Sequence, residues 1–239
     1  MSLDYRAALH REVALFVRAS RTDLTAQVVH CPEWTVADLT WHMCGVLRFW
    51  RAIGTGEITS PADEARVEYE RVPDGELAAL LEHEAAEITN TVYDIEPATP
   101  VWSWSAQKDV GFIQRRMAQE SAVHRWDAEL AVGAPNPIDA DLAVDGVDEF
   151  LTLFLPAEEE SLAGPIDRIR LETTDRDAGW TVTAGNGRCA VGDGEADVVA
   201  RAAASDLLLL LWTRREASAV AVEGDESVLA RFLARSDLT

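Results

Sequence analysis

Two residues in the segment MAQESAVHRWDAEL, positions 117–130, carry side chains that could do chemistry. Glu120 and His124 are four positions apart, so in a helix both side chains lie on the same face. The same face carries Ile113 and Met117, which indicates that it points toward the protein core. Burying an unpaired carboxylate costs several kcal/mol, so Glu120 needs a partner that compensates its charge.

A second helical segment offers such a partner. His42 lies on an apolar stripe that includes Leu39 and Met43. A divalent metal ion held by His42, Glu120 and His124 would compensate the carboxylate. Two histidines and one carboxylate suit Zn²⁺ with an open fourth position, or a non-haem Fe²⁺ site. The alternative is a plain hydrogen-bonded pair, because Glu and His at this spacing commonly bond to each other within one helix.

Helices are expected to position these residues. Apolar side chains recur at helical spacing in four segments, residues 4–28, 36–51, 76–92 and 112–131. Thr35 and Asp38 form a carboxylate variant of the capping box at the start of the second segment. Four such helices predict an antiparallel four-helix bundle over residues 1–135, and bundle cores commonly hold metal sites.

The remainder, residues 136–239, has a different pattern and predicts a small α+β domain. Residues 168–202 alternate apolar and polar side chains and contain the turn pair Asn186-Gly187, so we expect antiparallel strands there. Further elements are expected around them: helices at 142–154, from a cap at Ser205, and at 225–236, and a strand at 219–224. The fold class is therefore α and α+β in two domains.

Composition limits the function. The formal net charge of −21 argues against a nucleic-acid or anionic-membrane partner, because both require clustered Lys and Arg. The three cysteines, Cys31, Cys44 and Cys189, fit neither a disulfide framework nor a zinc knuckle, so we expect a reducing cytoplasm. The charged N-terminal segment does not read as a signal peptide. Cys44 follows His42 by two positions, points to another helix face, and is expected to be a small buried residue.

Two stretches resemble a known family. CPEWTVADLTWHMCG and RRMAQESAVHRWDAE resemble the C-P-x-W-T-V-x-D-L-x-x-H and E-x-x-x-H-R-x-D-A motifs of the mycothiol-dependent maleylpyruvate isomerase family, which has a DinB-like metal-binding bundle. The resemblance implies that His42, Glu120 and His124 hold a divalent metal, zinc in the first place. SDLLLLLWTRR and VAVEGDESVLARFLARS resemble the family's second domain, which is similar to sterol carrier proteins.

The resemblance also implies an activity. The thiol would be mycothiol, the low-molecular-weight thiol of actinobacteria, and coordination at an open metal position would convert it to a thiolate. The partner would be a small-molecule electrophile. Two reactions stay open: cis–trans isomerisation of a maleylpyruvate-like acid, and transfer of the thiol to an electrophile. The family further implies an assisting arginine from the second domain, for which we choose Arg214 as the catalytic residue.

Several nearby residues have simpler interpretations. Arg115, Arg116 and Arg125 are expected to be solvated surface side chains. Asp127 either orients a ligand histidine or forms a salt bridge on the helix surface.

Two other classes of function remain alternatives. One is a lipid or small-molecule binding module with a structural metal, and the other is a zinc-dependent redox-sensing regulator, which only Cys44 supports. We expect a monomer or a homodimer.

Overall fold

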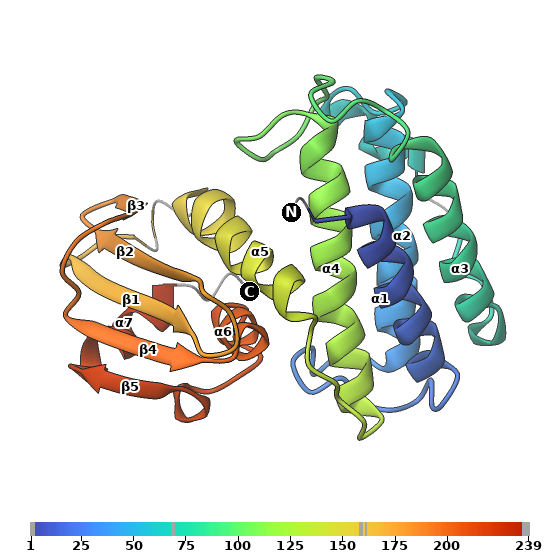
Figure 1. Cartoon of the computed structure of the whole chain (residues 1–239). Coiled ribbons are helices and arrows are strands. Elements are labelled where there is room, and N and C mark those ends of the chain that lie inside the picture. Colours follow the sequence, from blue (N-terminus) through green and yellow to red (C-terminus); the bar gives the residue numbers. More distant parts are fainter. Residues whose placement is uncertain (1–2, 68–69, 158–159, 161, 236–239) are drawn as a thin grey trace. The chain divides into compact units, whose positions relative to one another are not determined.

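The computed structural model describes residues 3–67, 70–157, 160 and 162–235. The chain divides into two compact units, Met1–Asn136 and Pro137–Thr239 (Figure 1). The first is helical and the second contains a sheet, so the predicted fold class, an α domain followed by an α+β domain, is confirmed. None of the described helices is long and apolar enough to cross a membrane.

Four long helices make up the first unit, with a short 3₁₀ segment, Pro61–Val67, between the second and the third. They are α1 (Tyr5–Ser20), α2 (Val36–Gly54), α3 (Asp74–Thr91) and α4 (Val110–Ala131). α1 packs against α4 and α3, and α2 packs against α3 and α4, as Figure 1 shows. The diagonal pairs of the bundle are therefore α1 with α2 and α3 with α4, and α2 lies beside α4.

Side-chain caps fix where the two site-bearing helices begin. The predicted capping box of α2 is present: the backbone N–H of Asp38 donates to the Thr35 hydroxyl (3.3 Å), and the N–H of Thr35 donates to the Asp38 carboxylate (2.9 Å). At α4, the Asp109 carboxylate accepts from the N–H of Phe112 (3.0 Å). Both caps satisfy backbone donors that a helix start leaves open.

A buried ion cluster joins α1 to α4. Arg125, which was expected on the surface, is 1% exposed, so that prediction was wrong. Its guanidinium donates to Glu12 (2.8 Å), to Glu129 (2.8 Å) and to the carbonyl of Asn136 (2.6 Å). Both carboxylates are buried as well, so the three charges compensate one another away from water.

The second unit is built around one five-stranded sheet of order β3-β2-β1-β4-β5. Its strands are β1 (Asp167–Thr173), β2 (Gly179–Gly185), β3 (Arg188–Gly192), β4 (Val198–Ala202) and β5 (Ala221–Gly224). Its helices are α5 (Ala140–Glu149), continued by a π turn at Phe150–Phe154 and a 3₁₀ turn at Leu155–Ala157, then α6 (Ala204–Leu211), a 3₁₀ turn at Ala217–Ala219, and α7 (Glu226–Arg235). The final residue of the last predicted helix, at 236, lies outside the described residues.

Two details of this unit correct the sequence analysis. β1 pairs with β4 in parallel, whereas only antiparallel strands were expected, because alternation does not reveal the order of strands in a sheet. α6 starts at Ala204 with no side-chain cap. Ser205 lies inside the helix, and its hydroxyl accepts from the N–H of Ile138 (2.9 Å). The turn at Asn186-Gly187 is as expected, since both residues have positive φ (53° and 73°) between paired strands.

Candidate metal centre

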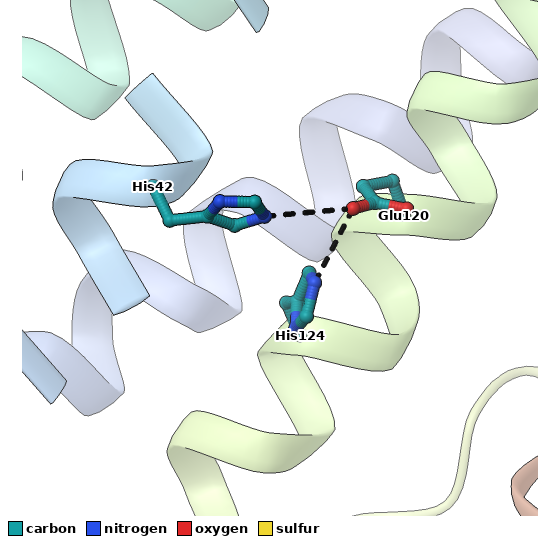
Figure 2. A group of neighbouring side chains, drawn as sticks. All are labelled: His42, Glu120 and His124. Carbon is teal, nitrogen blue, oxygen red and sulfur yellow. Dashed lines mark ion pairs between the residues drawn. The ribbon is translucent and has the colours of Figure 1, made fainter. Parts of the chain in front are cut away.

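The three residues singled out for metal binding come together in the bundle. His42 extends from α2, and Glu120 and His124 extend from α4, toward one point between the two helices (Figure 2). One carboxylate oxygen, Oε1 of Glu120, lies 3.3 Å from Nε2 of His124 and 3.8 Å from Nε2 of His42. Their donor atoms all lie within 4.8 Å of one another. The bundle order accounts for this, because it makes α2 and α4 neighbours.

The second oxygen of Glu120 has a partner of its own. Oε2 lies 3.0 Å from Nη2 of Arg116, one helical turn earlier on α4. Arg116 was expected on the surface, yet its side chain is only 3% exposed, so that prediction was wrong. The signal was present in the sequence, since Arg116 precedes Glu120 by four positions, the spacing of a helical ion pair. The arginine leaves Oε1 as the oxygen that faces the histidines.

Asp127 determines which nitrogen of His124 faces the cluster. Its carboxylate lies 3.1 Å from Nδ1 of His124 and is buried, so it orients the histidine instead of forming a surface salt bridge. The hydrogen bond to Asp127 requires a hydrogen on Nδ1. In the neutral ring, Nε2 is then unprotonated, and its lone pair faces Glu120. A carboxylate behind a histidine is the usual arrangement around protein-bound zinc.

The pKa values of the cluster reflect these contacts. Burial disfavours the charged form of Glu120, but Arg116 and the hydrogen bonds from His124 and His42 outweigh it, so the pKa of the carboxyl lies well below its usual range. Burial also disfavours a charged imidazole, but the hydrogen bonds to Asp127 and Glu120 raise the pKa of His124 to about 9. Without a metal, a proton on His124 therefore balances the carboxylates around it.

The donor set fits a divalent cation. With metal–donor bonds of about 2.1 Å, the donors of a tetrahedral zinc site lie about 3.4 Å apart. The 3.3 Å and 3.8 Å separations from Glu120 Oε1 are close to that value. The rings of His42 and His124 are nearly perpendicular, with centroids 5.3 Å apart. Three donors of this kind leave room for a fourth ligand.

His42 also borders a cavity of about 880 Å³ on the first unit. The cavity is lined mainly by α2 and the segment before it, and Trp34 packs against the His42 ring with centroids 4.9 Å apart. His42 is the most exposed of the three candidate ligands, at 34% of its side chain. The cavity gives a small molecule access to this ligand, and sequence analysis did not predict it.

The other predicted residues lie elsewhere. Cys44 is fully buried, and burial, followed by the charge of Glu84, raises the pKa of its thiol to about 12. It is therefore a small buried residue, as expected. Arg214 belongs to the second unit, where it is buried and donates to the carbonyl of Trp212 (2.7 Å).

Comparison with known proteins identifies the family. A family model described as the mycothiol maleylpyruvate isomerase N-terminal domain matches residues 6–129, more than half of the chain. The chain belongs to the mycothiol maleylpyruvate isomerase family. A second model, described as the MDMPI C-terminal domain, matches residues 141–231. The family resemblance inferred from the two motifs is thus confirmed, and a family named for an enzyme agrees with the prediction of an enzyme.

Solved structures share the fold of this family member. One is a crystal structure of the mycothiol-dependent maleylpyruvate isomerase, and another is a variant of that enzyme in which a histidine is replaced by alanine. Each shares 14% sequence identity with this chain at a TM-score of 0.61, and covers 92% of this chain and 91% of its own. None of the curated proteins matches the chain. At this identity the likeness establishes the fold of both units.

Replacing Asp127 by Asn is expected to weaken metal binding without removing it. The amide can no longer hold the Nδ1 proton of His124 as a charged acceptor, so affinity should fall by roughly 10-fold to 100-fold. Competition with a chelator measures this change. The control is Asp94→Asn, since Asp94 is an exposed residue that pairs with Arg6. An unchanged affinity in Asp127→Asn would mean that Asp127 does not support the metal ligand.

Proposed function

We propose that this chain is a metal-dependent enzyme that uses mycothiol as a thiol cofactor or cosubstrate. His42, Glu120 and His124 hold the metal. Zinc is the first candidate, and another divalent metal is the alternative. The reaction is either cis–trans isomerisation of a maleylpyruvate-like acid or transfer of the thiol to a small electrophile. The observation that carries the proposal is the single carboxylate oxygen that faces two imidazole nitrogens, in a member of a family named for a mycothiol-dependent activity.

The side chains of the cluster prepare it for a thiol. A bound divalent cation lowers the pKa of a thiol and so supplies a nucleophilic thiolate near neutral pH. Arg116 and the two histidines keep Glu120 ionised, and Asp127 fixes the orientation of His124. These residues set the positions of the donors before any ligand arrives, which reduces the reorganisation that binding requires.

The catalytic interpretation is favoured over a structural metal. Structural zinc is usually closed by four protein ligands, whereas catalytic zinc usually has three and an exchangeable position. Among the described residues, the cluster has three candidate ligands, and His42 borders a cavity. A regulatory role through Cys44 has less support, because its thiol is buried and its pKa is raised.

Metal affinity is expected to rise with pH. His124 has a pKa of about 9 in the metal-free protein, so below that pH a metal has to displace its proton. Affinity should therefore increase by about tenfold per pH unit between about pH 7 and pH 9, and level off above. Chelator competition at several pH values measures the slope. A flat profile over this range would contradict the assignment of His124 as a ligand.

Arg214 is the proposed arginine that assists catalysis from the second unit. Its replacement by Ala should lower turnover by roughly 100-fold, the usual effect of losing one group that stabilises developing negative charge. Metal content should stay unchanged. Arg215→Ala is the matched control, since Arg215 is exposed and pairs with Asp206 (3.2 Å). Equal rates in the two variants would remove Arg214 from the mechanism.

Turnover with mycothiol tests the proposed function. The metal-loaded chain should accelerate the isomerisation of maleylpyruvate or the conjugation of a small electrophile when mycothiol is the thiol. Glutathione should support little of either reaction, and His42→Ala should abolish both. If the metal-loaded protein accelerates neither reaction and instead binds fatty acid tightly, the lipid-binding alternative replaces the proposal.

A further inference from the structure

The cavity beside His42 has an aromatic wall. Four large aromatic side chains line it, Trp34, Trp41, Phe49 and Trp50. Its volume of about 880 Å³ is within the range of small-molecule sites, which is about 300 to 1,000 Å³. Aromatic side chains provide large, rigid surfaces for apolar and ring-shaped molecules. The cavity therefore has the size and the lining of a ligand site.

Two side chains of the aromatic wall, Trp34 and Trp50, make ring contacts that favour their positions. Trp34 packs against the ring of His42 at a centroid distance of 4.9 Å. Trp50 makes edge contacts with Phe112 (5.3 Å) and with Trp104 (5.8 Å). A molecule lying on this wall is thus beside one of the proposed metal ligands, where an activated thiol would be available.

The charged side chains of the cavity do not favour an anion. Among the described lining residues, Arg71 is the one arginine or lysine, and its guanidinium contacts Asp38 (2.5 Å) and Asp74 (3.1 Å). Hydrogen bonds from Thr35, then Arg71, lower the pKa of Asp38 to about 2, so this carboxylate is ionised at any physiological pH. Glu33 adds a further acidic group to the lining. Arg71 is therefore already paired with two carboxylates, and the acidic side chains of the lining outnumber it.

The charge of the whole chain acts in the same direction. A formal net charge of −21 produces a negative potential that slows the approach of anions and disfavours their binding. A dicarboxylate would meet this potential first and then the carboxylates of the cavity. An uncharged molecule would be repelled by neither and would gain contact with the aromatic wall.

We propose that the cavity beside His42 holds the electrophile and selects an uncharged molecule with apolar or aromatic surface over a dicarboxylate. The inference rests on the proposed function, because it places the substrate next to a thiol activated at the metal. It separates this chain from an enzyme adapted to a dianionic acid such as maleylpyruvate.

A matched pair of substrates tests the selectivity. Maleate and dimethyl maleate have the same cis double bond, and a thiolate isomerises either one by adding to a carbon, allowing rotation, and leaving again, so that the thiol is regenerated. Each rate with the metal-loaded full chain and mycothiol is divided by the rate with mycothiol alone, which removes the difference in intrinsic reactivity. We expect at least a tenfold lower KM for the ester. An equal or lower KM for maleate would overturn the inference.

Binding gives a second readout that needs no turnover. 2-Phenylsuccinate and its dimethyl ester do not react with thiols, and quenching of tryptophan fluorescence reports their binding. The ester should bind at least tenfold more tightly than the acid. Equal affinities would contradict the inference. Absence of turnover with both maleate compounds contradicts the proposed function instead, and the binding comparison then still decides the selectivity of the cavity.

Two variants with matched controls locate the effect. Trp41→Ala should weaken ester binding about tenfold, while Trp102→Ala, outside the cavity lining, should not. Glu33→Lys should improve binding of the acid, while Glu96→Lys makes the same charge change at an exposed position outside the lining and should not. If the control variants change binding as much as Trp41→Ala and Glu33→Lys, the cavity is not the site.

Discussion

Replacing His42 or His124 by Ala is expected to remove the proposed metal, so the metal content of the purified protein should fall from about one equivalent to nearly none. Each substitution removes one of the three candidate donors found among the described residues, and Glu120 with a single histidine should not hold a divalent cation against dialysis. Because no activated thiol forms without the metal, turnover should fall to the rate of mycothiol alone. Elemental analysis measures the metal, and a thiol-dependent assay measures the rate.

His83→Ala is the control for this loss, since His83 is an exposed histidine on α3. It should keep full metal content and full turnover. Helix content measured by circular dichroism shows whether the His42 and His124 variants still fold. Retention of the metal at full stoichiometry in either of these two variants would contradict the ligand assignment.

Arg125→Met should destabilise the bundle by about 3 to 5 kcal/mol. The side chain is 1% exposed and bonds to two buried carboxylates, Glu12 and Glu129. Methionine fills much of the volume but removes the buried cation that both carboxylates share. Among the described residues, Glu12 then keeps only Arg11 (3.0 Å) and Glu129 only its hydrogen bonds from Asn136, and a buried charge that loses a charged partner is costly. Urea unfolding of the metal-free protein, followed by helix content, measures the change in the free energy of unfolding.

Two further variants separate this cluster from a general effect of removing an arginine. Arg18→Met changes an exposed residue of α1 and should alter stability by no more than about 0.5 kcal/mol. Adding Glu12→Gln to Arg125→Met should recover part of the lost free energy of unfolding, because it removes one of the two buried charges that lose Arg125. A change below about 1 kcal/mol in Arg125→Met would show that the cluster does not stabilise the bundle.

Local patterns in the sequence predicted much of this molecule. The capping box of Thr35 and Asp38 and the turn at Asn186-Gly187 depend on residues within a few positions of each other. Helical periodicity placed Glu120 and His124 on one face, since one turn separates them. These features were predictable because their interactions lie within a single element.

Long-range pairing was not predictable in the same way. Arg125 looked like a surface residue because its partner Glu12 is 113 positions away, and periodicity does not show whether a charged side chain finds a partner. The parallel pairing of β1 with β4 depends on strand order, which alternation does not encode. The convergence of His42 on Glu120 likewise required α2 to lie beside α4. The apolar faces of the two helices suggested it, and the family motifs strengthened it, but neither showed how the helices pack.

Titration of mycothiol into the metal-loaded and metal-free chain tests the central claim most directly. Calorimetry should detect saturable binding of about one mycothiol per chain, and only when the metal is present, because the thiol needs the position left open by His42, Glu120 and His124. His124→Ala should bind none. Saturable binding that is equally strong without the metal, or no binding to the fully loaded protein, would contradict the account.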